Sequence, residues 1–172
     1  LDPSYRVYYP DTELNIPADY TALQSLFESI EPGSAEKLNQ FLKEAAYKYQ
    51  VGIQKLVHKP GQSLTEFLDM DLVKGLLRLD VFTSMKKHVR KFFSHPHLIQ
   101  LVEFPVLFLG ALPGDIPALY SLMNYADMKL GTWYPQGGMY KIAEAMHALA
   151  TETGVEFQFE TDVKKIKVDA NQ

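Results

Sequence analysis

The sequence predicts an α+β fold that is mostly helical and contains a few strands. Apolar residues recur at the spacing of a helix face in several segments of the middle of the chain. Strict alternation of polar and apolar residues, which is typical of half-buried strands, is found only toward the two ends. The predicted order is therefore a hairpin, many helices, and then a helix followed by two strands.

The composition is that of a folded globular chain. Its 172 residues suffice for one domain with a hydrophobic core, and 47% of them are apolar. The formal net charge of −4 argues against a general nucleic-acid-binding role. The absence of cysteine excludes disulfides, a thiolate nucleophile and a cysteine-based metal site. The sequence also has no run of 18 apolar residues, the minimum for a membrane-spanning helix.

The first third of the chain predicts a hairpin and two helices. Residues 5–9 and 13–16 favour strands and flank turn residues at 10–12. Asp19 is expected to cap a helix, which ends at the Glu-Pro-Gly sequence 31–33, and Ser34 is expected to cap the next one. The apolar positions of these two helices are Tyr20, Leu23, Phe27 and Ile30, then Leu38, Leu42, Ala45, Tyr49, Ile53 and Leu56. Ser63–Glu66 has the pattern of a capping box before a short helix.

Residues 80–93 predict a basic amphipathic helix. Its buried side is expected to carry Phe82, Met85, Val89 and Phe92, and its other side Lys86, Lys87, Arg90 and Lys91. Such a basic face suits an anionic membrane surface or phosphates, and a solvated face on a core helix is the ordinary alternative. His95 and His97 flank a proline without a nearby third ligand, so we predict no metal site there.

Residues 98–112 are the most apolar part of the chain. Pro105 and Gly110 interrupt them, so we expect either core or the lining of a pocket for an apolar ligand. A helix is predicted from Ile116 to about Met128, another from Met139 to Gly154, and strands at 155–159 and 161–168.

A glycine pair, Gly137 and Gly138, lies between an aromatic stretch and the helix that begins at Met139. Glycine lets a bulky group approach the backbone, and the unpaired N–H groups of a first helical turn suit an electron-rich ligand atom. An ordinary strand-to-helix turn is the alternative explanation. The ten glycines form no glycine-rich phosphate loop, and the chain has no serine nucleophile elbow.

Several segments resemble the phytoene desaturase (carotenoid desaturase) family. The specific part is Trp-Tyr-Pro-Gln-Gly-Gly-Met at 133–139 with its following helix. Residues 2–7, 154–157 and 162–166 follow the family order as well. The other matching segments are 93–98, 107–110 and 117–120.

The resemblance implies an FAD-dependent oxidoreductase of the amine-oxidase-like superfamily that dehydrogenates long polyenes. The chain would be an internal fragment, inactive and a poor flavin binder alone. Residues 1–130 would belong to the substrate-binding domain, and 131–172 would lead back to an FAD-binding domain that the fragment lacks. We expect a cytoplasmic protein whose basic helix can contact a membrane peripherally, with no nucleic-acid partner. The resemblance names no catalytic acid or base and leaves the oligomeric state open.

By resemblance, the flavin site includes five residues of the last part of the chain. Gly137 and Gly138 would lie near the isoalloxazine ring, with Trp133 and Tyr134 close to the flavin or the substrate. The backbone of Val163 would contact the adenine. Residues expected to line an apolar substrate tunnel are Phe104, Phe108, Leu119, Tyr120 and Met123.

Other functions remain open. The substrate would be phytoene, another carotenoid or a different lipid, and carotenoid isomerases and retinol saturases have similar middle regions. An amine oxidase is disfavoured, because a site for a cation would carry more polar groups than residues 98–112 offer. A non-catalytic helical module that binds lipid or a partner helix is the alternative outside the enzymes.

Overall fold

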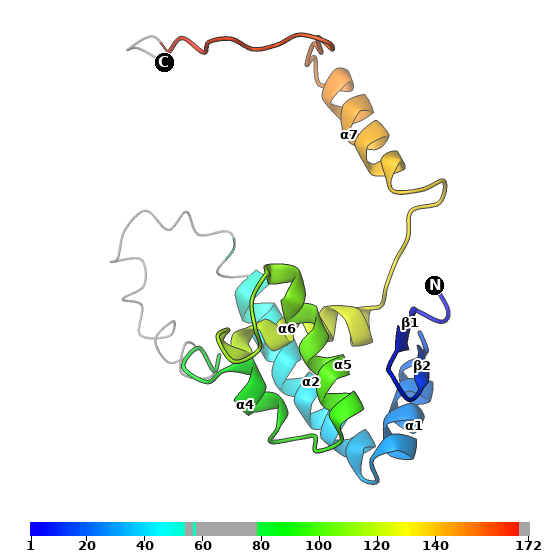
Figure 1. Cartoon of the computed structure of the whole chain (residues 1–172). Helices are drawn as coiled ribbons and strands as arrows, with labels where there is room; N and C mark the ends of the chain where they lie inside the picture. Colours follow the sequence, from blue (N-terminus) through cyan, green and yellow to red (C-terminus); the bar gives the residue numbers. More distant parts are fainter. Residues whose placement is uncertain (54–56, 58–78, 169–172) are drawn as a thin grey trace. The chain divides into compact units, whose positions relative to one another are not determined.

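The computed structural model describes residues 1–53, 57 and 79–168, and the chain forms two compact units. The first unit spans Leu1–Thr132 and the second spans Trp133–Gln172 (Figure 1). Leu56 and the capping-box segment Ser63–Glu66 lie outside the described residues.

The predicted N-terminal hairpin and first helix are confirmed. Strand β1 (Tyr5–Tyr8) pairs antiparallel with β2 (Glu13–Ile16), so that Tyr5 lies opposite Ile16. Helix α1 (Tyr20–Ile30) begins after Asp19, whose Oδ1 accepts a hydrogen bond of 2.8 Å from the Ala22 N–H. The spacing of apolar residues gave the buried face correctly, since Leu23 and Phe27 are buried.

The prediction that Ser34 caps the second helix is wrong. Helix α2 (Ser34–Val51) is preceded by Gly33 at φ +82°, and Ser34 is its buried first residue. The carboxylate of Glu28, on α1, accepts hydrogen bonds from the N–H groups of Gly33 (2.7 Å) and Ala35 (3.1 Å). The short turn brings the end of α1 over the start of α2, so a carboxylate from the preceding helix satisfies the free donors.

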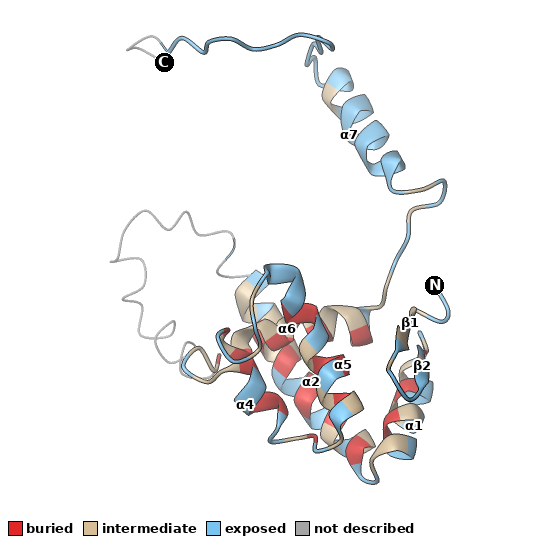
Figure 2. Ribbon diagram, in the orientation of Figure 1, coloured by how far each residue is buried: buried red, intermediate tan, exposed pale blue. Residues whose placement is uncertain are grey.

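Helix α2 packs against α1 and α6 (Leu122–Tyr125). Its predicted stripe is confirmed at Leu38, Leu42 and Ala45, which are all buried. Phe41 and Lys48, which the prediction left outside the stripe, are buried as well. Figure 2 shows buried residues on α1, α2, α4 and α5, among other elements of the first unit, and most of the buried apolar side chains, together with Ile16 of β2, form one hydrophobic core.

The helix predicted over residues 80–93 is much shorter in the structure. Helix α4 spans Met85–Val89, and the Ser84 hydroxyl accepts a hydrogen bond from the Lys87 N–H at its start. Residues 79–83 form turns, with Asp80 at φ +53°. The Asp80 carboxylate forms an ion pair with Lys48. The cap of the shorter helix is Ser84, whereas a helix over residues 80–93 would have needed a capping residue further upstream.

The two faces of this segment are partly as predicted. Met85 and Val89 are buried and Phe92 is half-buried, but Phe82 is 91% exposed because it lies in the turn before the helix. All the residues of the predicted basic face are exposed, namely Lys86, Lys87, Arg90 and Lys91.

The apolar segment 98–112 divides between the core and the surface. Helix α5 (Pro96–Glu103) continues into the 3-10 helix η3 (Phe104–Leu109), which ends at Gly110 with φ +67°. The buried apolar residues of the segment 98–112 include Leu98, Leu101, Val102 and Val106. Its exposed apolar residues are Phe104, Leu107, Phe108, Leu109 and Leu112.

The helix predicted from Ile116 to Met128 consists of three consecutive helical turns of different kinds. The 3-10 helix η4 (Ala118–Ser121) leads into α6, which leads into the π-helix η5 (Ala126–Leu130). Gly131, at φ +93°, ends this run just before the second unit.

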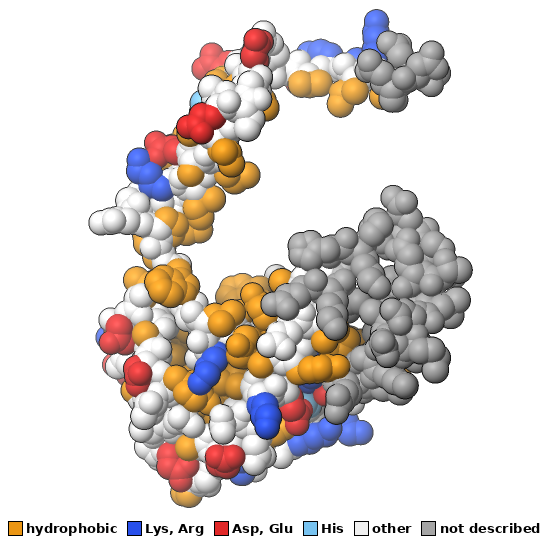
Figure 3. All heavy atoms as spheres, turned by 180° about the vertical axis from the view of Figure 1, so that it is seen from behind, with side chains coloured by type: hydrophobic (Ala, Val, Ile, Leu, Met, Phe, Trp, Pro, Cys, Tyr) orange, Lys and Arg blue, Asp and Glu red, His pale blue; other side chains and the backbone are white. Residues whose placement is uncertain are grey.

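The second unit contains the predicted helix but not the predicted strands. Helix α7 (Tyr140–Glu152) ends before Gly154 at φ +91°. Residues 155–159 and 161–168 carry neither helix nor strand, because a strand requires a paired neighbour and neither segment has one among the described residues. Figure 3 shows hydrophobic side chains along one side of α7 and charged ones on the opposite side.

Part of the apolar face of α7 lies against residues of its own unit. Tyr140, Ala143, Met146, His147 and Ala150, which the spacing places on one face, line a hollow of about 660 Å³ together with Phe157 and Phe159. The His147 and Phe157 rings lie 4.4 Å apart between centroids. Even so, none of residues 133–168 is buried.

Candidate functional site

An apolar pocket of about 980 Å³ lies in the first unit, bounded by β1, α5, η3 and the α6–η5 segment. Of the residues expected to line a substrate tunnel, Phe104, Phe108 and Met123 line this pocket. Leu119 and Tyr120 are not among its lining residues, and Tyr120 packs partly against the core instead. Their contact with a substrate remains a prediction.

Two aromatic rings form part of the pocket wall. The Phe104 and Phe108 rings lie edge to face, with centroids 5.3 Å apart and an interplanar angle of 76°. Their side chains are 45% and 74% exposed, which is costly for large apolar groups unless a ligand or surface covers them. The segment 98–112 thus contributes both to the core and to the wall of a mostly apolar pocket, and the binding of an apolar ligand there remains a prediction.

The pocket also contains a fixed carboxylate. The Tyr5 hydroxyl donates to Asp127 Oδ2 and the Thr132 hydroxyl donates to Asp127 Oδ1, each over 2.8 Å. Burial and the neighbouring Asp127 charge raise the pKa of the Tyr5 hydroxyl well above its usual range, so it stays a donor. Sequence reasoning missed this group, because no local pattern links residues 122 positions apart.

The glycine-pair turn lies at the start of the second unit. Gly137 and Gly138 have φ of +88° and +98°, a backbone conformation that favours glycine. Gly138 N–H donates to the Pro135 carbonyl over 3.0 Å, which closes the turn. Trp133 and Tyr134 beside it are 85% and 58% exposed.

The turn fits one face of a flat aromatic cofactor only in part. The glycines leave the backbone approachable, and the adjacent aromatic side chains are exposed. However, the N–H groups of Lys141 and Ile142 in the first turn of α7 already donate to the carbonyls of Gly138 and Met139. The expectation of unpaired donors at this helix start is therefore wrong for these two groups. Val163 is exposed, and its predicted contact with the adenine is untested.

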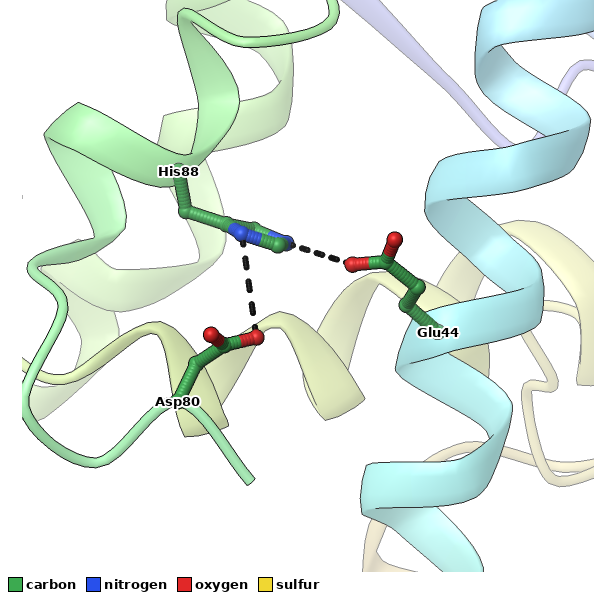
Figure 4. A group of neighbouring side chains, drawn as sticks. All are labelled: Glu44, Asp80 and His88. Carbon is green, nitrogen blue, oxygen red and sulfur yellow. Dashed lines mark ion pairs between the residues drawn. The ribbon is translucent and has the colours of Figure 1, made fainter. Parts of the chain in front are cut away.

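A buried polar cluster holds the first unit together away from the pocket. The Lys48 ammonium, whose side chain is 1% exposed, lies 2.9 Å from Asp80 Oδ2 and 3.3 Å from His88 Nε2. It also donates to Ser121 Oγ over 3.2 Å. Figure 4 shows the His88 ring between Asp80 and Glu44, whose carboxylate oxygen is 3.6 Å from His88 Nε2.

The protonation states follow from burial and the lysine charge. Burial, together with the adjacent Lys48 ammonium, lowers the pKa of His88 to about 4, so the ring is neutral at pH 7. Burial also lowers the pKa of Lys48, against the opposing effect of Asp80. Burial is the largest single effect on the Asp80 carboxyl and alone would raise its pKa, but the hydrogen bond from Lys48, the Lys48 charge and the weaker effects of its other basic neighbours together lower the pKa.

The same cluster has the composition of a metal site but already contains a cation. Ligand atoms of Glu44, Asp80 and His88 lie within 4.8 Å of one another. Because the Lys48 ammonium is in contact with two of these residues, a metal ion would have to displace it at the cost of a buried ion pair. We interpret the cluster as a structural link between α2, the turn at Asp80 and α4.

The comparisons with known proteins agree with the resemblance. The family model described as flavin containing amine oxidoreductase matches residues 2–172. The chain is 30% identical over 168 residues to the carotenoid 3,4-desaturase of Haloarcula japonica, covering 96% of this chain and 34% of the relative. It is 28% identical over 172 residues to the zeta-carotene-forming phytoene desaturase of Myxococcus xanthus, covering 99% of this chain and 33% of the relative.

A third relative is the 4,4'-diapolycopene oxygenase of a Methylomonas species, which is 30% identical over 172 residues, or 97% of this chain and 34% of the relative. The chain thus spans about a third of the length of the curated relatives it matches. Among the described residues, no helix has both the length and the apolar character needed to cross a membrane. The chain belongs to the flavin-containing amine oxidoreductase family, and the resemblance to its phytoene desaturases is confirmed.

Proposed function

We propose that this chain is part of an FAD-dependent oxidoreductase that desaturates a carotenoid precursor such as phytoene. The apolar pocket of the first unit is the observation that carries the proposal. A polyene offers few polar atoms, so its binding site must be mostly apolar and shaped by large side chains. Phe104, Phe108 and Met123 meet that requirement in a chain whose relatives are carotenoid desaturases.

The proposal assigns different tasks to the two units. Residues 1–130 would bind and orient the polyene and exclude water, and residues 131–172 would lead to the flavin-binding part of a longer protein. Bound FAD supplies the oxidation chemistry of such an enzyme. Gly137 and Gly138 would let the flavin ring approach the backbone, with Trp133 and Tyr134 beside it and the Val163 backbone near the adenine.

The proposal also includes a peripheral membrane contact, because the substrate is dissolved in lipid. The Lys86 N–H donates to the Pro113 carbonyl over 2.8 Å, so the basic helix α4 adjoins the end of the exposed apolar segment. Lysines beside exposed apolar groups are typical of surfaces that bind anionic bilayers. Changing Lys86, Lys87, Arg90 and Lys91 to Gln should weaken binding to anionic liposomes, and unchanged binding would refute this contact.

The visible absorption spectrum of the intact parent protein, purified without added cofactor, tests the enzymatic proposal. We expect flavin bands that bleach when phytoene is added without oxygen. The Phe108→Ala change should weaken the polyene interaction about tenfold by removing an aromatic wall of the pocket. Phe82→Ala is the matched control, because Phe82 is also exposed but is not among the residues that line the pocket.

The other outcomes separate the alternatives. A flavin spectrum that polyenes leave unchanged would keep the oxidoreductase class and point to a different substrate, as in a carotenoid isomerase, a retinol saturase or an amine oxidase. A colourless protein that does not take up FAD would favour a non-catalytic helical module that binds lipid or a partner helix.

A further inference from the structure

The mostly apolar pocket has two carboxylates in its wall, those of Asp127 and Glu103, and that of Glu103 is paired with Arg90. The two hydrogen-bond donors to Asp127, the hydroxyls of Tyr5 and Thr132, are both neutral. The basic side chain in the same wall, Arg6, is instead directed to Asn15 (2.7 Å) and to Glu13 (3.9 Å). Within the described part of the chain, Asp127 is therefore held in place by two neutral donors, and no ion pair links it to a basic side chain.

The carboxylate still has acceptor capacity to offer. Two carboxylate oxygens provide about four lone-pair sites, and the Tyr5 and Thr132 hydroxyls use one on each oxygen. A hydrocarbon that filled the pocket would expel water from the remaining sites and leave them without a donor, which is unfavourable for a charged group. A ligand with a hydroxyl group at that position would supply the missing donor.

We infer that the pocket takes an oxygenated polyene whose terminal hydroxyl donates a hydrogen bond to Asp127, in preference to a pure hydrocarbon. The inference rests on the proposed function, and it narrows the substrate to a long apolar chain with a polar end. In this arrangement Asp127 is the group that selects the substrate. Tyr5 and Thr132 are positioning residues, because they fix the carboxylate through hydrogen bonds and need not touch the ligand.

Binding measurements on the intact parent protein test this inference without relying on turnover. Quenching of protein fluorescence would give affinities for a C40 polyene hydrocarbon, the same polyene with one terminal hydroxyl, and a primary amine of matched chain length. We expect the alcohol to bind about tenfold more tightly than the hydrocarbon, which is the effect of a hydrogen bond to a charged acceptor. Asp127→Asn replaces the charged acceptor with a neutral amide and should clearly reduce this difference, whereas the exposed Asp115→Asn should leave the difference unchanged.

A second variant changes the preference in the opposite direction. Thr132→Val frees Asp127 Oδ1, so it should increase the advantage of the alcohol over the hydrocarbon. A carboxylate that merely braces the fold would instead lower both affinities alike. This variant retains the carboxylate, so it decides the question even where Asp127→Asn does not fold.

Three results would overturn the inference. These are equal affinities for alcohol and hydrocarbon in the unmodified protein, a preference that Asp127→Asn leaves undiminished, or tightest binding of the amine, which would assign Asp127 to a cationic ligand. Failure of the proposed function is distinct, because then neither polyene would bind or bleach the flavin.

Discussion

The two units of this chain differ in how they use their apolar residues. In the first unit, side chains such as Leu23, Phe27 and Phe41 are at most 1% exposed and form one core. In the second unit, α7 also has an amphipathic sequence, yet Met146 and Leu149 remain 67% and 63% exposed. The helical pattern is therefore similar in both units, and what differs is that the described residues of the second unit form no buried core of their own for α7 to pack against.

This difference shows that the spacing of apolar residues predicts which face of a helix is apolar, but not which residues pack against that face. The hydrophobic effect stabilises a helix only in proportion to the apolar area that is removed from water. Short helices and unpaired strands contribute little stability of their own. The first unit should therefore carry the cooperative stability of the chain, and the second unit should respond to mutation only locally.

The largest expected effect comes from truncating a core aromatic residue. Phe27 is fully buried and lies edge to face with Phe93, with ring centroids 5.6 Å apart. Phe27→Ala should lower the free energy of unfolding of the first unit by about 3–5 kcal/mol, because it removes buried apolar area and leaves a cavity. Denaturant unfolding followed by circular dichroism measures this loss.

The matched change in the second unit is Phe159→Ala, at a side chain that is 72% exposed. It should change the free energy of unfolding by less than about 0.5 kcal/mol, as for other exposed positions. Similar losses for the two variants would contradict the contrast between the units.

The next effect is the dependence of the stability of the first unit on pH, through His88. The pKa of His88 is lowered from 6.5 to about 4 in the fold by burial and the Lys48 charge. Above pH 6.5 the ring is neutral in both states, so its contribution is fully present. As the pH falls from 6.5 to 4, the unfolded chain takes up a proton and the folded one does not. Stability should fall by about 3 kcal/mol over this interval and, for this group, not below it.

Unfolding free energies at several pH values between 7 and 4 measure this slope, and His88→Gln should flatten it. A titration of the His88 ring by NMR with a pKa near 6.5 would show that the ring is not held neutral. The second unit should keep its helix content over the same interval.

Sequence reasoning recovered what depends on neighbours along the chain. The predictions that Asp19 caps α1 and that Leu23 is buried are confirmed, because capping and helical spacing depend on residues close in the sequence. Ser34 was assigned wrongly because its role is taken by Glu28 of the preceding helix. The site divides in the same way, since the aromatic pair Phe104 and Phe108 stands out from composition alone.

The remaining features depend on contacts that no local pattern encodes. Lys48 is buried because Asp80 and His88, 32 and 40 positions away, supply its partners. The Asp127 carboxylate lines the pocket and accepts a hydrogen bond from Tyr5 of β1, which lies at the other end of the sequence of the first unit. The strands predicted at 155–168 have suitable alternation, but alternation cannot supply the paired strand that they need.

A smaller loss than that expected for Phe27 or His88 is predicted at the end of α7, where it tests how local the response of the second unit is. Gly154 has φ +91°, where an alanine is strained even though nothing lies within 4 Å of its added Cβ. Gly154→Ala should therefore cost about 1 kcal/mol through backbone strain alone. Amide hydrogen exchange should show faster exchange in the last turn of α7 and unchanged exchange in α2. Gly52→Ala is the control within the first unit, since Gly52 has φ −62° and ordinary spacing of 3.4 Å to a Leu122 methyl group. Faster exchange in α2 after Gly154→Ala would mean that the two units unfold together, and the contrast between them would then fail.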